Sequence, residues 1–506
     1  MKNKLQQFAI LTLFMMTVVI LLFVFVPQFI YVTIVVECFA LLASMHLIFF
    51  DQRPVSAKFA WILTILLIPY AGLLCFLLIG KNPRSRKIPQ LQRNSESLLQ
   101  QKVAEIVEKE HAYFNERHPL SHELFCLSGK HALMGNQLDV FHDGKQAFDQ
   151  ILADIEAAQH HIHVFYFIIK GDRTGAKLLQ LLAKKAATGV KVKLMYDSLG
   201  SIKLPYDMLR PLEESGGEVR PYDLVNSPLL STRINWRNHR KMVVVDGKIA
   251  HIGGMNIGNE YLSQTDKFRY WRDTNMRMSG LAVLEVQEVF IYDWLFLDPD
   301  QSTIGDFLSD VTLYFPTSQR CMQGETVQII YGGPYDSERV IRDAFIDSIG
   351  KAAKSIKLAM PYFVPDEESF SALRRAARCG IQVQVIIPGK GDRGVSFHGS
   401  NSFIDRLMDA GIEVYFYDPR SFIHCKVMIV DDEIATIGST NFDMRSFYLN
   451  HELSAFIYGP SKTIDALIQQ FSVDLAKSIS IDQLRQERTV LTIIKERLSA
   501  LFIPLL

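Results

Sequence analysis

The sequence repeats itself once, with an offset of about 190 residues between matching segments. Residues 148–196 contain a helix-like segment, an apolar strand-like segment and a second helix-like segment, followed by Gly189-Val190-Lys-Val192. Residues 345–387 follow the same order and end in Gly380-Ile381-Gln-Val383. One duplication at this spacing predicts two similar domains rather than a stack of short repeats. Two such domains can face each other and form one site between them.

Strand-like and helix-like segments alternate within the first repeat. Residues 164–169 are apolar and β-rich, residues 175–187 have helical spacing, and residues 190–194 alternate as a strand does. This alternation predicts an α/β fold with a mostly parallel sheet. We therefore expect two duplicated α/β domains, with mixed or parallel sheets packed face to face.

Three apolar runs precede the duplicated part, at residues 8–26, 29–50 and 59–80. Each is close to the ~20 residues that a helix needs to cross a bilayer. The only ionisable side chains inside them are Glu37 and His46. A cleaved signal peptide would have one shorter apolar core, so we interpret the runs as permanent anchors. We expect a multi-pass protein of the cell membrane.

The number and the orientation of the transmembrane helices stay open. Only Pro27 and Gln28 separate the first two runs, so the helices number two or three. Basic residues follow the third run: Lys81, Arg84, Arg86 and Lys87. The positive-inside rule then places the large domain in the cytoplasm. Lys2 and Lys4 favour a cytoplasmic N-terminus as well, and three crossings do not satisfy both signals.

Composition narrows the classes of protein. Lys and Arg together number 54, as do Asp and Glu, whereas a general nucleic-acid binder carries a basic excess. We therefore expect no nucleic-acid partner. The six cysteines are far apart and form no CxxC pair, so the sequence predicts neither a disulfide framework nor a zinc site.

Each repeat contains the motif His-x-Lys-x4-Asp-x6-Gly-[Gly/Ser]-x-Asn without a gap. The first copy consists of His239, Lys241, Asp246 and Asn256. The second copy consists of His424, Lys426, Asp431 and Asn441. One His-x-Lys pair on a strand is usually a surface pair, but two gapless copies at the same place in a repeat are hard to obtain by chance.

The spacing of the motif places its polar groups together. The apolar residues after each lysine predict a strand, on which residues two apart face the same side. His239 and Lys241 then point together, whereas Arg240 and, in the second copy, Cys425 point away. The asparagine follows a glycine-containing turn and returns to the same face on the next strand. Two such faces surround a phosphate and place one histidine on either side of it, as in-line displacement requires.

Metal binding is the main alternative for the histidines. Their matched neighbours are lysines rather than cysteine, aspartate or a second histidine, and an ammonium group repels a cation. We therefore expect a site that uses neither a metal nor a cofactor.

Both copies resemble the signature of the phospholipase D superfamily. The flanking segments are similar, more narrowly, to the bacterial type of the cardiolipin synthase family. They are Asn235-Trp-Arg-Asn-His-Arg-Lys241, Gly253-Gly-Met-Asn-Ile-Gly-Asn-Glu-Tyr261, Trp271-Arg-Asp-Thr274 and Pro361-Tyr-Phe-Val-Pro365. Arg53-Pro54, ahead of an apolar run with Pro69 and Gly72, resembles the membrane hairpin of that family. The first apolar run lies outside the resemblance.

The resemblance implies a role for each motif residue. His239 attacks phosphorus and becomes a phospho-histidine, and His424 is the general acid, although the two repeats alone leave open which histidine attacks. The residues implied to hold the phosphate are Lys241, Lys426, Asn256 and Asn441.

Four acidic residues complete the implied site. Asp246 and Asp431 belong to the catalytic motif, but we expect them to steady the fold rather than to touch substrate. Asp273 and Glu452 lie downstream of the two motifs and are candidates for the carboxylates that orient the histidines.

The implied reaction is phosphatidyl transfer between two phosphatidylglycerol molecules of the lipid bilayer, which gives cardiolipin and glycerol. The alternatives are a hydrolytic phospholipase D, a nuclease of the same fold, and a non-catalytic membrane scaffold. The expected parts are an anchor (1–80), a linker (81–135), two phospholipase D-like domains (136–320 and 321–480) and an amphipathic tail (481–506). The tail either lies on the membrane or packs on the catalytic domain, and the sequence leaves both open.

Overall fold

The computed structural model describes residues 28–51, 53, 55–80, 90–109, 118–222, 235–298, 303–316, 324–336, 338–392, 394–480 and 490–502. The described residues divide into a small unit, residues 28–80, and a large unit that contains the rest. The first apolar run, residues 8–26, lies outside the described residues.

In the small unit, the second apolar run forms one helix, α2 (Gln28–Phe49). Among the described residues it is the one helix long and apolar enough to cross a membrane, over Ile30–Phe49. The third run does not form the single spanning helix that we expected. It forms α3 (Val55–Leu67) and α4 (Pro69–Ile79), because Pro69 lacks the amide hydrogen that would continue α3 and restricts the residue before it.

The two short helices fold back on each other as a hairpin. The rings of Trp61 and Phe76 meet with their centroids 5.4 Å apart. A Cβ atom on Gly72 would lie 2.4 Å from the carbonyl oxygen of Thr64, so only glycine permits this close approach. At the open end, the Arg53 guanidinium donates to the carbonyl oxygen of Gly80 at 2.6 Å.

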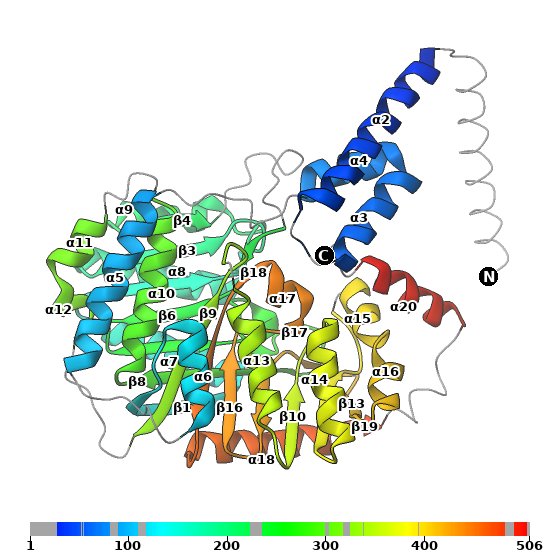
Figure 1. Ribbon diagram of the computed structural model, residues 1–506. Coiled ribbons are helices and arrows are strands. Elements are labelled where there is room, and N and C mark those ends of the chain that lie inside the picture. The colour runs from blue at the N-terminus through cyan, green and yellow to red at the C-terminus, as the bar shows by residue number, and fades with distance from the viewer. Residues whose placement is uncertain are drawn as a thin grey trace. The chain divides into compact units, whose positions relative to one another are not determined.

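In the large unit, two similar halves follow one another (Figure 1). The first half contains α7 (Gly144–Ala157), β2 (His161–Tyr166), α8 (Arg173–Ala187), β3 (Lys191–Asp197), α9 (Arg210–Glu214), β4 (Glu218–Tyr222), β5 (Arg237–Asn238), β6 (Lys241–Val245), β7 (Ile249–Gly253), β8 (Trp271–Ser279), α10 (Ala282–Phe296), α11 (Ile304–Ser309) and α12 (Val311–Tyr314). The two short 3-10 helices are η2 (Tyr206–Met208) and η3 (Asn259–Leu262).

The second half begins with β9 (Glu325–Gly332), α13 (Val340–Gly350), β10 (Ser355–Ala359), β11 (Phe363–Val364), α14 (Glu367–Arg378), β12 (Gln382–Pro388), α15 (Gly394–Asn401), α16 (Ile404–Asp409) and β13 (Glu413–Tyr417). It continues with β14 (Phe422–Ile423), β15 (Val427–Val430), β16 (Ile434–Gly438), β17 (Phe442–Asp443), α17 (Met444–Tyr448), β18 (Asn450–Tyr458), α18 (Lys462–Ala476) and β19 (Ser478–Ser480). The last helix is α20 (Val490–Phe502).

The same local signals build both halves. Asp172 caps α8 by accepting from the amides of Thr174 and Gly175, and Asp366 caps α14 through the amide of Ser369. Both helices end two residues before a glycine in the left-handed region, Gly189 with φ 91° and Gly380 with φ 86°. The next strand, β3 or β12, starts two residues after this glycine.

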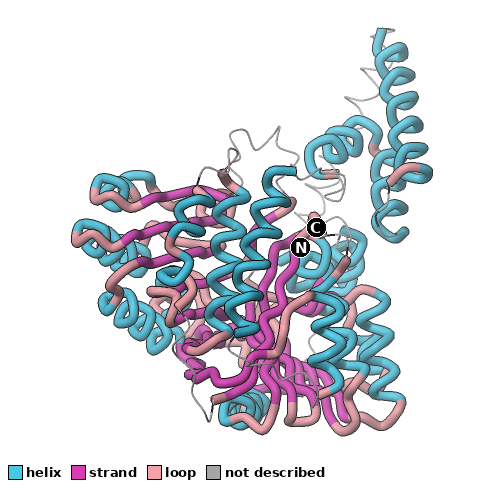
Figure 2. The backbone as a smooth tube through the Cα atoms, turned by 60° about the vertical axis from the view of Figure 1, so that its left-hand side comes forward, coloured by secondary structure: helices cyan, strands magenta, loops and turns pink. Residues whose placement is uncertain are grey.

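Each half has a mixed sheet, so the parallel part is smaller than the alternation of segments suggested. In the first half, β2–β3 and β3–β4 pair in parallel, while β2–β6, β6–β7, β7–β8 and β8–β1 are antiparallel. The second half repeats this order with β10, β12, β13, β15, β16, β18 and β9. Pairing of β1 (Leu133–Asp143) with β9 joins the two sheets, and Figure 2 shows the strands inside with helices around them.

The segment expected to be a linker, residues 81–135, belongs to the large unit over most of its described length. It forms α5 (Gln90–Lys109) and α6 (Pro119–Ser128). Leu99, Val103 and Val107 of α5 are buried in the core that contains α10. Their spacing of four residues makes one apolar stripe on an otherwise polar helix.

Candidate active site

The two motif histidines lie where the chain passes from one half to the other. His239 follows β5, which pairs in parallel with the start of β18, and His424 follows β14, which pairs in parallel with the start of β8. The amide of His239 donates to the carbonyl of His451 at 2.9 Å, and that of His424 to the carbonyl of Arg272 at 2.7 Å. Each histidine is therefore placed by a strand of the opposite half.

This register pairs each histidine with a carboxylate of the other half. Nδ1 of His239 lies 3.0 and 3.2 Å from the two carboxylate oxygens of Glu452. Nδ1 of His424 lies 2.7 Å from Oδ2 of Asp273. A carboxylate only accepts, so Nδ1 is the donor and Nε2 of each neutral ring carries a lone pair.

The two lysines bring both motifs to one place. Lys241 and Lys426 each donate to the carbonyl oxygen of the histidine two residues before them. Lys426 crosses into the first half, where its Cδ lies 3.1 Å from the point that a Cβ atom on Gly254 would occupy. The same Cβ would meet Asp273 at 2.3 Å, so this position of the first motif requires glycine.

The contacts of the lysines differ between the halves. The Lys426 amine lies 3.0 Å from Nδ1 and 3.3 Å from Nε2 of His424. The Lys241 amine instead lies 5.4 Å from the centre of the Phe167 ring. Among the hydrogen bonds described for the site, none engages Nε2 of His239, so the two imidazoles have different surroundings.

Burial and charge set the protonation of this cluster. Burial, opposed by Glu452, lowers the pKa of His239 to about 4. Burial and the neighbouring Lys426 lower the pKa of His424. Burial acts to raise the pKa of Glu452 and Asp273, but the histidine partners, the nearby lysines and further hydrogen bonds together outweigh it and lower both values. At neutral pH, two neutral imidazoles therefore face two ionised carboxylates.

The motif aspartates lie away from the reacting groups. Asp246 accepts hydrogen bonds from three consecutive backbone amides, those of residues 159–161, at 2.8–2.9 Å. Asp431 does the same for residues 353–355 at 2.6–2.8 Å. Both occupy left-handed turns, with φ 53° and 55°. The geometry supports a structural task for both residues and gives no ground for grouping them with the catalytic side chains.

We expected each motif asparagine to lie on the strand that follows the turn, but neither does. Each comes after that strand, because Gly253 and Gly438 end β7 and β16. The Asn256 side chain accepts from the Ile168 amide at 3.1 Å and donates to the Tyr261 hydroxyl at 2.9 Å. Oδ1 of Asn441 is buried and has no hydrogen-bond partner.

Residues that alternate with the site residues anchor the strands from behind. Arg240 points away from the site, as predicted, and forms a buried ion pair with Asp293 of α10 at 2.6 Å. Arg272, next to Asp273, pairs with Asp474 of α18 at 3.0 Å. The equivalent of Arg240 in the second half is Cys425, which is buried and also points away.

Sequence reasoning missed several groups around the histidines. The Phe167 ring lies 4.9 Å from that of His239, and the rings of Trp271 and Tyr261 lie 5.4 and 5.9 Å from that of His424. The Ser439 hydroxyl donates to Glu452. Ser439 occupies the motif position that Gly254 occupies in the first copy, and this difference was the signal available in the sequence.

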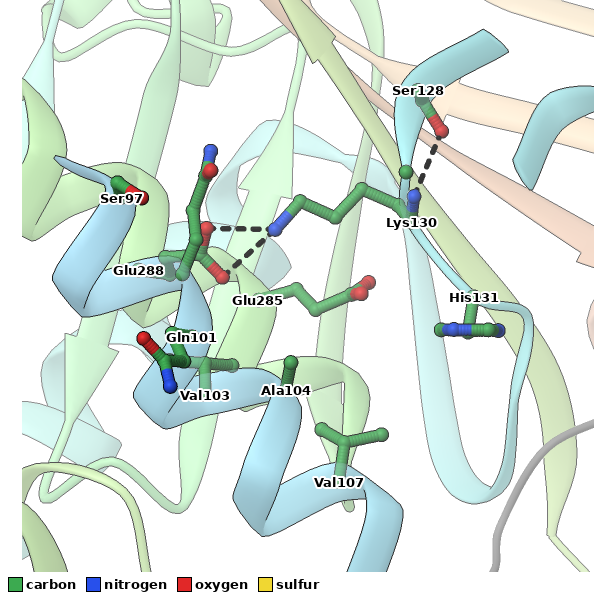
Figure 3. Close-up of a pocket in the computed structure, with 12 residues that line it drawn as sticks. Ser97, Gln101, Val103, Ala104, Val107, Ser128, Lys130, His131, Glu285 and Glu288 are labelled. Carbon is green, nitrogen blue, oxygen red and sulfur yellow. Dashed lines mark hydrogen bonds and ion pairs between the residues drawn. The ribbon is translucent and has the colours of Figure 1, made fainter. Parts of the chain in front are cut away.

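A separate pocket of about 360 Å³ lies under α5 (Figure 3). Lys130 reaches across it and donates to both carboxylate oxygens of Glu288 at 2.7 and 2.8 Å. Burial raises the pKa of the neighbouring Glu285 to about 8. No motif residue lines this pocket. Across the described ranges of the chain, no group of three or more His, Cys, Asp or Glu side chains is arranged to hold a metal ion.

Comparison with known proteins agrees with the geometry. The family described as "Cardiolipin synthase, PLD-like domain" matches residues 151–294 and 345–475, and "Phospholipase_D-nuclease N-terminal" matches residues 38–81. The phosphatidylserine synthase structure of Haemophilus influenzae superposes with a TM-score of 0.57 at 17% identity, covering 76% of this chain and 96% of that one. The fold is thus the duplicated α/β fold of phospholipase D-like proteins, as predicted.

Sequence relatives define the family within that class. "Cardiolipin synthase" of Listeria welshimeri is 36% identical over 469 residues, which are 91% of this chain and 95% of the relative. "Cardiolipin synthase 1" of Bacillus anthracis is 37% identical over 470 residues, 91% of each chain. "Cardiolipin synthase" of Geobacillus thermodenitrificans is 35% identical over 478 residues, 92% of this chain and 94% of the relative. This chain belongs to the cardiolipin synthase family of phosphatidyltransferases, and the resemblance drawn from its motifs is confirmed.

Proposed function

We propose that the protein joins two phosphatidylglycerol molecules into cardiolipin and releases glycerol. The observation that carries the mechanism is the pair of buried histidines, each held by a carboxylate from the opposite half, with Lys426 acting electrostatically on both. Burial lowers the pKa of Lys241 and Lys426, and a bound phosphodiester would favour their charged form. One phosphodiester then fits this set, with the lysines neutralising its charge and an imidazole on either side of its phosphorus atom.

His239 is the nucleophile in this proposal. Glu452 holds its Nδ1 hydrogen, so Nε2 attacks the phosphorus of the first lipid while the bond to the departing glycerol breaks. His424 gives that glycerol oxygen a proton. His424 then takes the proton of the second lipid's hydroxyl, whose oxygen attacks the phospho-histidine and releases His239 unchanged.

The contacts of the lysines make the two histidines unlike. The Lys426 amine lies 3.0 and 3.3 Å from the two ring nitrogens of His424, whereas the corresponding amine in the first half lies over Phe167. The acid role requires a protonated His424. A bound phosphodiester adds a negative charge next to the imidazole and raises its pKa, so we expect His424 to take up its proton together with substrate.

The other phosphate contacts and the membrane arrangement complete the proposal. Lys241, Lys426 and the second amide hydrogen of Asn256 bind the phosphate oxygens, and Asn441 is the equivalent group in the second half. The family and the apolar helix α2 make the protein membrane-associated. We further propose that it crosses the cell membrane more than once, with the large unit in the cytoplasm.

A product assay tests the function. Purified protein in phosphatidylglycerol vesicles should form cardiolipin and glycerol in equal amounts, with little phosphatidic acid and without a nucleotide-activated lipid. His239→Ala and His424→Ala should each abolish the transfer. Phosphatidic acid as the main product would replace the synthase by a hydrolase, and near-normal turnover of either variant would refute the shared site.

A further inference from the structure

Exposed apolar side chains of the large unit gather on two of its segments. Among the described residues of this unit, the large apolar side chains classed as exposed are Leu98, Ile202, Tyr206, Val473, Ile493, Ile494 and Leu498. Three of them lie on α20 and two on the segment that follows β3. These two segments therefore need a physical explanation that single scattered apolar residues do not.

Within residues 492–499, the part of α20 whose side chains are described, three apolar groups point outward and an acidic one is buried. Glu496 has 2% of its surface exposed, whereas Ile493, Ile494 and Leu498 are 41–52% exposed. The helix also packs against α15. An amphipathic helix normally turns its apolar stripe inward, so the outward stripe here is suited to an apolar environment.

The segment after β3 is linked to His239. Ser201 donates to the carbonyl of Phe167 at 3.2 Å, and the Phe167 ring lies 4.9 Å from the His239 ring. Ile202, the next residue, is 67% exposed. This apolar side chain therefore stands one residue away from a contact that reaches the site.

The helix α20 is linked to His424 through α15. That helix starts two residues after Asp392, whose carboxylate accepts from the Tyr362 hydroxyl at 2.8 Å and acts electrostatically on His424. The residues after β3 and the helix α15 follow equivalent strands, β3 and β12, in the parallel part of each sheet. The segment after β3 is thus connected to the surroundings of His239, and α20 packs on the helix that begins two residues after a carboxylate that acts on His424.

We propose that these two segments form a rim, consisting of Ile202, Tyr206, Ile493, Ile494 and Leu498, that enters the surface of an anionic lipid bilayer and presents the site to phosphodiesters there. Exposed basic side chains accompany the rim: Lys203, Lys495 and Arg497. Apolar side chains with adjacent basic ones fit the acyl boundary and the headgroups of anionic lipids. A second copy of the chain would oppose like charges at a symmetric contact, so the bilayer is the better partner.

The inference rests on the proposed function. A comparison of two substrates distinguishes failure of the rim from failure of the proposed function. Ile202→Glu combined with Ile494→Glu should lower the transfer rate on dilute phosphatidylglycerol vesicles by about tenfold or more. The rate on a soluble short-chain phosphatidylglycerol below its micellar concentration should stay within about twofold, because the site itself is unchanged. The control is Val473→Glu, because Val473 is 42% exposed and its helix, α18, lies away from α20 in Figure 1. This substitution should leave both rates unchanged.

Fluorescence gives a readout that does not depend on activity. The native protein has four tryptophans, so quenching is measured as the change relative to it. The fluorescence added by Ile494→Trp should be quenched by vesicles of phosphatidylglycerol with brominated acyl chains, whereas that added by Val473→Trp should not be. An equal loss of rate on vesicles and on soluble lipid, or the absence of quenching at position 494, would refute the rim. Quenching at position 494 in a protein that forms no cardiolipin would support the rim and refute the proposed function.

Discussion

Replacing Asp273 by asparagine and Glu452 by glutamine should impair different steps of the reaction. Asp273 contacts only the imidazole of His424 among the histidines, at 2.7 Å, and Glu452 only that of His239, at 3.0 Å. Each amide keeps the size of the side chain but removes the charge that stabilises a positive imidazole. Asp273→Asn should therefore weaken proton transfer, whereas Glu452→Gln should weaken nucleophilic attack.

The expected magnitude follows from the burial of both pairs. General acid catalysis contributes about 10²–10⁴ in rate, and a fully buried carboxylate supplies much of the stabilisation of its imidazolium. We expect Asp273→Asn to lower the transfer rate on phosphatidylglycerol by about 10²–10³. With a phosphatidyl ester of 4-nitrophenol, whose leaving group needs no proton, the first turnover of Asp273→Asn should be close to the native rate.

Stopped-flow release of 4-nitrophenolate measures this first turnover directly. Glu452→Gln should lose most of the burst rate on the activated ester, because the proposed attacking group is His239. The control is Asp154→Asn, which disrupts another buried carboxylate–imidazole contact, 2.7 Å from His251, outside the site. Rescue of Glu452→Gln instead of Asp273→Asn would exchange the two roles, and equal rescue of both would refute the pairing across the halves.

Three further results are expected. Activity should survive a strong chelator, because Lys241 and Lys426 supply the positive charge; full loss on chelation, restored by a divalent ion, would contradict a metal-free site. Asp293→Ala leaves the Arg240 guanidinium buried without its partner, so it should lower the free energy of unfolding by about 3–5 kcal/mol in a denaturant titration. Burial raises the pKa of Glu285 to about 8 from its usual 4.5, so ionisation of this residue costs stability as the pH rises between these values. Glu285→Gln should therefore raise the midpoint of thermal unfolding more at about pH 9 than at about pH 5, and an equal effect at both would contradict the shifted pKa.

The parts of the fold that depend on local pattern were predictable from the sequence. The alternation of apolar segments gave the α/β class, and the gapless repeat of the motif gave the duplication. Arg240 and Cys425 alternate with the site residues and point away, as strand geometry requires. These features depend on residues a few positions apart, so periodicity alone carries them.

The pairing of each histidine with a carboxylate of the opposite half, called the exchange below, could not be predicted in this way. It depends on β5 pairing with β18 and β14 pairing with β8, and each of these contacts involves two residues on either strand. Strand pairs so short leave no periodic signal. The sequence identified Asp273 and Glu452, but the partner of each follows only from the register.

In two other segments the structure differs from what length and average composition predicted. The cause is visible in the sequence in both cases. Residues 59–80 are long enough for one membrane helix, but Pro69 divides them into two helices that are each shorter than a bilayer. Residues 81–135 are polar on average, although Leu99, Val103 and Val107 form a buried stripe. In both cases, a single position or stripe outweighed the mean property of the segment.

The exchange also explains why the duplication is functional rather than incidental. One half alone contains a histidine and a carboxylate, but that carboxylate points to the histidine of the other half. Lys426 likewise lies against Gly254, so the second half completes the first-half side of the site, and the glycine is what admits it. The equivalent position in the second half is Ser439, whose hydroxyl binds Glu452 instead. The two halves have thus kept the same strands and the same motif histidine but differ at this position, as they do at Arg240 and Cys425, and these differences give the two imidazoles unlike surroundings.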